Sequence, residues 1–159
     1  MKKQLFPLLF LLGFFGLGAQ NSLTLERKIS WANGPSNYIL SDGTPFEVWK
    51  FEGCSFGDDA RSLPVFSERF PLPAKSELSV EIVSVQWESY AKKASADDSF
   101  LSNDLKINTL VVQERQQFYG AVHFIPVRKT GNSYERVTSF TLNVRITPLP
   151  VAPTPAVDR

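Results

Sequence analysis

Apolar and polar residues alternate along most of the chain, and this period of two limits the possible folds more than any other feature of the sequence. The clearest run is Phe140, Leu142, Val144 and Ile146, each separated from the next by one polar or charged residue. In an extended strand every second side chain points to the same face, so such a run forms a strand with one buried face. No segment of ten or more residues has the spacing of an amphipathic helix. The pattern therefore predicts an all-β protein.

Segments with strand character recur along the chain, separated by turns rich in Gly, Pro and Asn. We expect strands over residues 22–31, 38–40, 46–51, 78–87, 105–112, 118–127 and 134–146. Thr130-Gly131-Asn132-Ser133 has the composition of a tight hairpin turn. About seven short strands joined in this way predict an antiparallel β-sandwich or a barrel-like domain.

Some segments depart from simple alternation. Residues 64–70 have prolines at or just beyond both ends, and because proline cannot donate to a ladder we expect an edge strand or a non-strand path. Within residues 78–87 the apolar positions change phase, which indicates a bulge or a strand buried on both faces. Arg27 interrupts the apolar face of the first strand, and residues 90–103 are polar and small, as in a helical turn or a mobile loop.

Residues 1–19 have the organisation of a secretory signal peptide. Met1-Lys2-Lys3 is positive, residues 5–17 are largely apolar, and Gly18-Ala19 supplies small residues, so we expect cleavage between Ala19 and Gln20. The apolar run is shorter than the roughly 20 residues that a bilayer-spanning helix needs. Lipid attachment would require a Cys at the cleavage point, and the single Cys is Cys54. The expected product is exported, without a lipid anchor or a membrane span.

The rest of the chain divides into a β domain over residues 20–147 and a Pro-rich linker or tail over residues 148–159. The tail contains Pro148, Pro150, Pro153 and Pro155. Proline has no backbone N–H, so we expect this segment to be stiff, extended and unable to join a ladder.

Charge and composition exclude several function classes. The full chain has 17 basic and 16 acidic residues, and removal of Lys2 and Lys3 leaves a net charge of −1. This balance gives no reason to expect nucleic acid as a partner. A single Cys and a single His exclude an internal disulfide framework, a CxxC motif and an HExxH zinc site. We expect no cofactor.

Cys54 and His123 are the one combination that offers a nucleophile and a base. Cys54 lies between apolar strands, and His123 lies between Val122 and Phe124 in the middle of an expected strand. Both are better explained as structural residues, a small buried thiol and a strand histidine.

Other polar pairs also have ordinary explanations. Asp58-Asp59 and Asp97-Asp98 could contribute calcium ligands, but neither has the spaced Asp-x-Asp-x-Asp pattern, so solvated loop acids are expected. Trp31, Trp49 and Trp87 lie in apolar strand patterns and are expected in the core, although exposed tryptophans would stack on sugars. The basic pairs Arg27-Lys28, Lys92-Lys93 and Arg128-Lys129 form no single stripe.

Four stretches carry a resemblance to a known family. They are residues 23–31, residues 51–56 (Phe-Glu-Gly-Cys-Ser-Phe) with residues 63–66 (Leu-Pro-Val-Phe), residues 69–73 (Arg-Phe-Pro-Leu-Pro), and residues 133–144. In order and spacing they resemble the N-terminal region of the type IX (Por) secretion system sortase of Bacteroidetes, which belongs with the gingipain-like cysteine peptidases. A signal peptide ending in Gly-Ala-Gln suits the same phylum.

The resemblance implies a non-catalytic module. In such proteins a β-rich segment similar to a gingipain propeptide precedes the peptidase domain, assists its folding, and covers or restrains its active site. The whole protein trims a C-terminal signal from exported cargo and attaches the cargo to surface lipopolysaccharide. The implied partner is a cysteine peptidase domain, in cis or in trans. The implied location is the periplasm, outer membrane or surface of a Gram-negative bacterium.

The resemblance carries over no catalytic residue. The family's catalytic His precedes its Cys on an α/β domain, whereas here Cys54 precedes His123 and both lie in the β region. The sequence stops at Arg159, where the peptidase would begin, so we expect a separated or truncated N-terminal module that is not itself an enzyme. Propeptides of this group can offer a basic residue to a peptidase pocket, and Lys92, Lys93 and Arg61 are the candidates here. A free-standing secreted adhesion or carbohydrate-binding sandwich stays open as an alternative.

Overall fold

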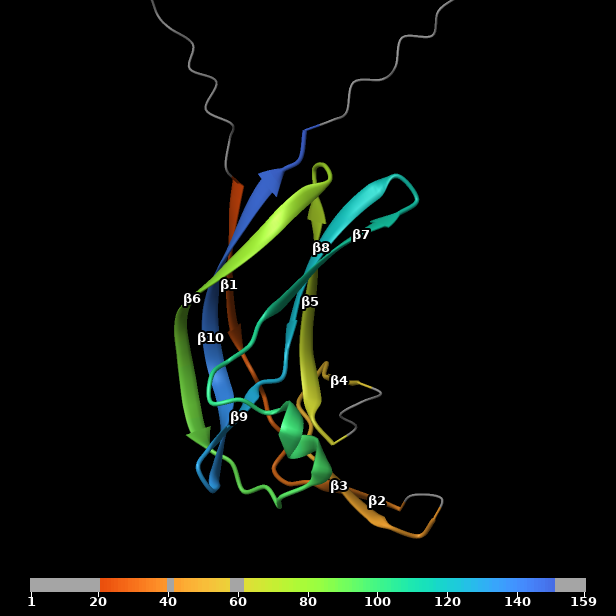
Figure 1. Ribbon diagram of the computed structural model, residues 1–159, viewed down its shortest axis with the longest axis vertical. Coiled ribbons are helices and arrows are strands. Elements are labelled where there is room, and N and C mark those ends of the chain that lie inside the picture. The colour runs from red at the N-terminus through yellow and green to blue at the C-terminus, as the bar shows by residue number, and fades with distance from the viewer. Residues whose placement is uncertain (1–20, 40–41, 58–61, 151–159) are drawn as a thin grey trace, which may run out of the picture.

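A computed structural model describes residues 21–39, 42–57 and 62–150 (Figure 1). The expected signal peptide with its Ala19–Gln20 cleavage site, Asp58-Asp59, Arg61 and residues 151–159 lie outside the described residues. Within those ranges the protein is all-β, as predicted, and the helical content is one 3-10 turn, η1 (Ala96–Phe100). The described residues contain no helix long and apolar enough to cross a membrane.

The described chain forms ten strands rather than about seven. They are β1 (Asn21–Lys28), β2 (Ser36–Ile39), β3 (Pro45–Val48), β4 (Ser55–Phe56), β5 (Pro64–Leu72), β6 (Ser76–Ser89), β7 (Asn108–Glu114), β8 (Gln117–Phe124), β9 (Val127–Thr130) and β10 (Ser133–Pro148). The strands missed from the sequence, β4 and β9, have two and four residues, which is too short for alternation to be recognised.

The long strand β10 organises the first sheet. One edge of β10 pairs with β6 over residues 135–148, while the other edge pairs with β1 over residues 139–146 and with β9 over residues 133–136. The second sheet has the order β4-β5-β8-β7, so β8 is central in it, and its apolar sequence is typical of a central strand. All these pairs are antiparallel. The β2–β3 hairpin forms a small separate sheet at the lower end of the view.

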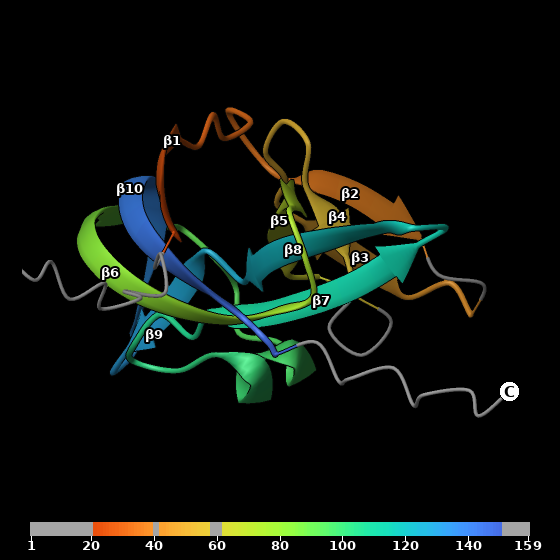
Figure 2. The same cartoon turned by 90° about the horizontal axis from the view of Figure 1, so that it is seen from above.

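The two four-stranded sheets pack face to face and enclose one apolar core (Figure 2). Phe66 and Phe124 of the second sheet contact Phe140 of the first, with ring centroids 5.0 and 5.2 Å apart. Gly120 of β8 permits this close packing, because a Cβ there would lie 2.5 Å from the Phe70 ring and 2.9 Å from Leu78. No ladder joins the two sheets in the described chain, so the fold is a sandwich rather than a closed barrel.

The phase change in β6 is a bulge, which is one of the two structures that the sequence predicted. The register with β10 shifts between Thr141 and Leu142, where Val83 is the additional residue on β6. Leu78 and Val80 before the bulge, and Val85 and Trp87 after it, all pack against the core. The extra residue therefore restores the inward direction of both halves of β6.

Residues 118–127 do not form one strand, because the chain changes sheets at Ile125-Pro126. β8 ends in the second sheet at Phe124, and β9 begins in the first sheet at Val127. Proline cannot donate the hydrogen bond that would continue the ladder, which is consistent with the break at Pro126. The predicted hairpin turn connects β9 to β10, and Gly131 has a positive φ of 61° there.

The proline-containing segment at residues 64–72 is a complete strand, β5, whose outer edge is covered by β4 at Pro64 and Val65. Its position near the edge of the sheet agrees with the expectation from its prolines. The ladder of β10 extends through Pro148, which lies opposite Ser76, and the N–H of Leu149 donates to the Lys75 carbonyl at 2.9 Å. The expectation that no residue after 147 joins a ladder is therefore wrong at Pro148.

A charged pair spans the two sheets at the β1–β5 side. Arg27, which interrupts the apolar face of β1, donates from Nε to a Glu68 carboxylate oxygen at 2.8 Å, and its second nitrogen pairs with the other oxygen. Glu68 lies on β5, between Phe66 and Phe70, which contact the core. The break in the alternation of β1 is thus matched by a break in the alternation of β5.

Candidate functional site

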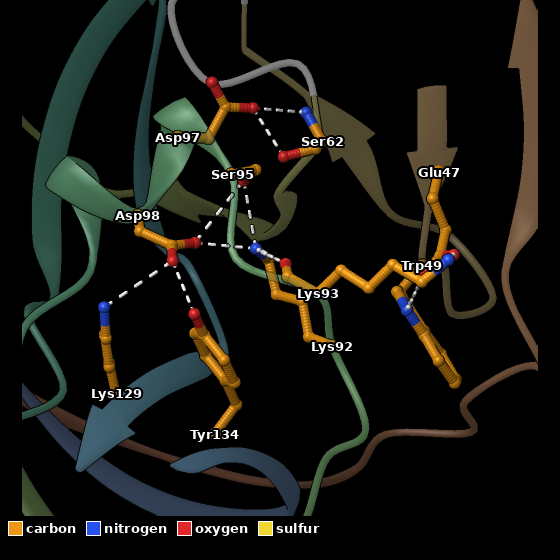
Figure 3. Close-up of polar contacts among 10 residues, drawn as sticks. All are labelled: Glu47, Trp49, Ser62, Lys92, Lys93, Ser95, Asp97, Asp98, Lys129 and Tyr134. Carbon is orange, nitrogen blue, oxygen red and sulfur yellow. Dashed lines mark hydrogen bonds and ion pairs between the residues drawn. The ribbon is translucent and has the colours of Figure 1, made fainter. Parts of the chain in front are cut away.

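The segment that follows β6 carries the two candidate basic residues of the described chain, Lys92 and Lys93. It lies at the lower end of the sandwich in Figure 1, and Figure 3 shows its polar contacts. Lys92 Nζ lies 2.6 Å from Asp98 Oδ1 and also donates to the Lys93 carbonyl at 2.8 Å and to Ser95 Oγ at 3.0 Å. The Lys92 side chain is 5% exposed and that of Asp98 is 12% exposed. Lys92 therefore forms a buried ion pair that closes its own loop.

The other oxygen of Asp98 connects this loop to the β9–β10 hairpin. Asp98 Oδ2 accepts a hydrogen bond from the Tyr134 hydroxyl at 2.5 Å and lies 3.7 Å from Lys129 Nζ. Burial raises the pKa of Asp98, but the hydrogen bonds from Lys92 and Tyr134 outweigh it and lower the pKa to about 2. The same hydrogen bond raises the pKa of Tyr134 to about 12. Asp98 is thus a fixed anion between two cations and a phenol.

Asp97 fastens the same turn to the start of β5. One of its oxygens accepts from the Ser62 N–H at 2.8 Å and from the Ser62 hydroxyl at 2.5 Å. Ser62 is buried, and it directly precedes the buried Leu63. The expectation that Asp97 and Asp98 are solvated loop acids is wrong, since both are structural acceptors. The described residues contain no group of three or more His, Cys, Asp or Glu side chains arranged for a metal ion.

Lys93 points away from this cluster. Its side chain is 88% exposed, and its ammonium lies 3.9 Å from a Glu47 carboxylate oxygen, which is a loose surface pair. Glu47 is held in turn by the Trp49 indole N–H at 3.2 Å. A cavity of about 420 Å³ lies here, with Glu47, Trp49, Ser62, Lys93, Ser95 and Asp97 in its lining. Of the adjacent lysines, Lys93 alone presents its charge to solvent.

Aromatic rings pack beside the cavity and explain the tryptophans. Trp31 contacts Tyr90 at a centroid distance of 5.7 Å, and Trp49 contacts Tyr90 at 4.8 Å. The Arg136 guanidinium lies 5.2 to 5.8 Å from the Trp31, Trp49 and Tyr90 rings. Trp87 packs against the core under Arg128, whose guanidinium lies 4.1 Å from its ring. All three tryptophans are half-buried and packed against the core clusters, as predicted, and Trp49 also lines the cavity.

Tyr90 has an unusual environment for a phenol. Its hydroxyl is buried and has no hydrogen-bond partner among the described residues. Burial raises the pKa of Tyr90 far above its ordinary value, so the group is neutral at any physiological pH. Tyr90 is therefore a packing residue that holds Trp31 and Trp49 together.

Cys54 and His123 are not assembled as a catalytic pair. Cys54 packs against the inner core cluster. His123 alternates with the buried Val122 and Phe124, so its side chain lies on the outer face of β8. The sheet separates the two side chains, and Cys54 is half-buried rather than buried as expected.

Sequence reasoning named Lys92, Lys93 and the two aspartates but missed how they connect. Tyr134 and Ser62 complete the cluster. Tyr134 lies 36 residues along the chain from Asp98, and Ser62 lies 35 residues from Asp97. The one local signal for the cluster is the position of Lys92, six residues before Asp98. The loop between them is too polar to be held by apolar burial alone, which favours an ion pair within it.

No family model and no curated protein matches this sequence. Two solved structures from Porphyromonas gingivalis are similar in fold. A complex of the pro- and mature domains of RgpB contains a chain with a TM-score of 0.56 at 14% identity, covering 79% of this chain and 80% of that one. A structure that addresses the zymogenic latency of gingipain K has a TM-score of 0.53 at 10% identity, covering 82% of this chain and all of the matched chain.

The likeness confirms the fold that the sequence resemblance implied, that of a gingipain propeptide-like region. The matched region covers most of this chain and is not confined to a single hairpin. The identities of 14% and 10% are too low to transfer the role of any single residue.

Proposed function

We propose that this chain is the propeptide-like module of a type IX secretion system sortase from a Bacteroidetes species, and that it binds and restrains a cysteine peptidase domain. It acts without chemistry of its own, after export to the periplasm, outer membrane or cell surface. The observation that carries the proposal is the fold, which is similar to that of a chain in a complex of pro- and mature peptidase domains. The separation of Cys54 from His123 supports a non-catalytic role.

Lys93 is the residue through which restraint would act. Lys92 is committed to Asp98 inside the loop, whereas Lys93 is exposed at the rim of the cavity. The Lys92 pair and the Asp97–Ser62 contact hold the backbone at Lys93 in place, so its ammonium is presented by a rigid support. Such a preorganised cation would enter an acidic peptidase pocket at a small entropic cost.

The test combines the mature chain, residues 20–159, with the peptidase domain of the type IX sortase from the same bacterium. Binding is measured by calorimetry, and inhibition is measured from the hydrolysis of a peptide that carries the C-terminal cargo signal. We expect a complex and a slower hydrolysis. No binding at chain concentrations of tens of micromolar would overturn the proposal.

The matched variants Lys93→Ala and Lys28→Ala separate the inhibitory residue from general charge. Each variant removes one exposed lysine, and Lys28 lies on β1, outside the Lys92–Asp98–Tyr134 cluster. We expect Lys93→Ala to weaken inhibition while Lys28→Ala retains it. Equal inhibition by both variants would remove Lys93 from this role.

A further inference from the structure

The outer face of the second sheet has an apolar centre between polar ends. In the first sheet the outward positions of β1 and β10 hold Thr24, Glu26, Thr141, Asn143 and Arg145, which alternate with buried apolar residues. In the second sheet the outward positions at the two ends are polar as well, with Asn108 opposite His123 at one end and Glu114 opposite Gln117 at the other. The outward positions of β7 and β8 between these ends are apolar.

The apolar outward positions of the second sheet lie side by side. Leu110 of β7 is opposite Ala121 of β8, Val112 is opposite Tyr119, and Pro71 of β5 is opposite Tyr119 on the other edge. These five residues are here called the β7–β8 strip. Leu110 is 51% exposed, although it is a large aliphatic side chain. Pro71 is exposed as well, and Val112, Tyr119 and Ala121 are half-buried, so the strip offers a contiguous apolar surface of the kind on which partners dock.

The strip ends in a charged pair. Arg69 of β5 places its guanidinium 3.7 Å from the centre of the Tyr119 ring and 2.7 Å from a Glu114 carboxylate oxygen. Both charged side chains are substantially exposed. An apolar, aromatic centre with Arg at its border has the composition of a protein–protein interface rather than of a small-molecule site.

The position at which the chain leaves the sandwich indicates which partner lies there. Leu149 is bound to Lys75, and Gln117, the first residue of β8, donates its side-chain amide to the Leu72 carbonyl at 2.7 Å. Leu72 and Lys75 border the same short β5–β6 connection, so the end of β10 and the β7–β8 turn lie at the same end of the sandwich, at the top of Figure 1.

A domain that followed Arg159 would therefore start within reach of the strip. The nine residues 151–159 can span at most roughly 30 Å. Strand β7, with seven residues, is about 23 Å long. A domain joined through this linker can therefore reach all of the β7–β8 strip.

We propose that the β7–β8 strip is the surface on which the cysteine peptidase domain docks when it follows this chain in the same polypeptide. This inference rests on the proposed function, because the occupant is the partner named there. It assigns binding affinity to the strip and leaves inhibition to Lys93.

The test measures the Kd of the mature chain for the peptidase domain in three forms: wild type, Leu110→Asp and Val83→Asp. Val83 is a matched control, because it is 61% exposed and lies at the β6 bulge in the other sheet. We expect Leu110→Asp to weaken binding roughly tenfold or more, since it buries an unpaired charge. Val83→Asp should change the Kd less than about twofold. Leu110→Ala removes apolar contact without adding charge, so we expect it to weaken binding by an intermediate amount. It replaces Leu110→Asp in the comparison if Leu110→Asp has a lowered Tm.

Each outcome is decisive for one of the two proposals. If the wild type binds and both Leu110 variants bind equally well, the strip is not the docking surface and the proposed function stands. If the wild type does not bind, the proposed function fails and the strip loses its occupant. A wild-type dimer in light scattering that Leu110→Asp dissociates, without peptidase binding, would identify a second copy of this chain as the occupant and overturn the proposal.

Discussion

The body of the sandwich and its lower end are stabilised by different forces. In the body, Val122, Leu142 and Val144 are fully buried apolar residues that adjoin one another across two sheets. At the lower end, Lys92, Asp98 and Tyr134 form a buried polar cluster in which each group needs the others. Apolar packing tolerates gradual change, whereas a buried charge depends on its partner. Changes in the two regions should therefore differ in size and in their response to pH.

The largest effect is expected from Leu142→Asp in the body. Leu142 has no exposed surface, so an aspartate there would be a buried charge without a partner. We expect a loss of unfolding free energy of about 4 kcal/mol or more, measured by chemical denaturation. Thr141→Asp, at the adjacent outward position, should cost less than about 1 kcal/mol. A near-wild-type Tm for Leu142→Asp would mean that the phase of β10 is wrong.

At the lower end, Lys92→Ala is expected to cost about 3 kcal/mol, because it leaves the Asp98 carboxylate buried without its closest cation. Lys93→Ala should change the stability by less than about 0.5 kcal/mol, since its pair with Glu47 is exposed and long. Thermal unfolding of the two variants compares neighbouring lysines directly. Equal losses would show that the cluster does not hold the loop.

Gly120→Ala tests the packing of the body by adding an atom rather than removing one. The new methyl would meet Phe70 and Leu78 at less than 3 Å, and both side chains are enclosed by the core. We expect a loss of about 2 kcal/mol from overpacking, measured by urea denaturation. A neutral result would mean that the two sheets can separate slightly without cost.

The response to acid separates the two regions. The folded-state pKa of Asp98, about 2, is below its ordinary 3.8, so its stabilisation is complete above pH 4 and is lost as the pH falls through 2. We expect wild type to lose about 1–2 kcal/mol more than Asp98→Asn between pH 5 and pH 2. Denaturation curves at the two pH values measure the difference. Identical pH dependence would show that Asp98 is not a stabilising anion.

The smallest effect is expected at the end of β10. Deletion of residues 151–159 should leave the unfolding free energy within about 0.5 kcal/mol, because the ladder of β10 is retained. Deletion from Pro148 onward also removes the Leu149–Lys75 hydrogen bond and should cost about 1 kcal/mol. The Tm values of the two shortened chains measure the contribution of that last pair. A larger loss on removing 151–159 would indicate that those residues pack on the domain.

The same division decides what the sequence could predict. The alternation of β10, the bulge of β6 and the central place of β8 follow from local patterns, because each buried face shows its own period of two. The change of sheet at Pro126 was not predicted, since apolar residues continue on both sides of it. The Lys92–Asp98–Tyr134 cluster was not predicted, because its contacts join distant segments through single polar atoms and leave no periodic signal.

The Arg27–Glu68 pair also has a consequence for how the protein meets other chains. The outer edges of β1 and of most of β5 have no ladder partner in the described chain, and unpaired edges are where foreign strands add during aggregation. A strand added at this side would desolvate both charged groups, at a cost of several kcal/mol for each ion. The pair therefore protects the open side of the sandwich against the addition of a foreign strand.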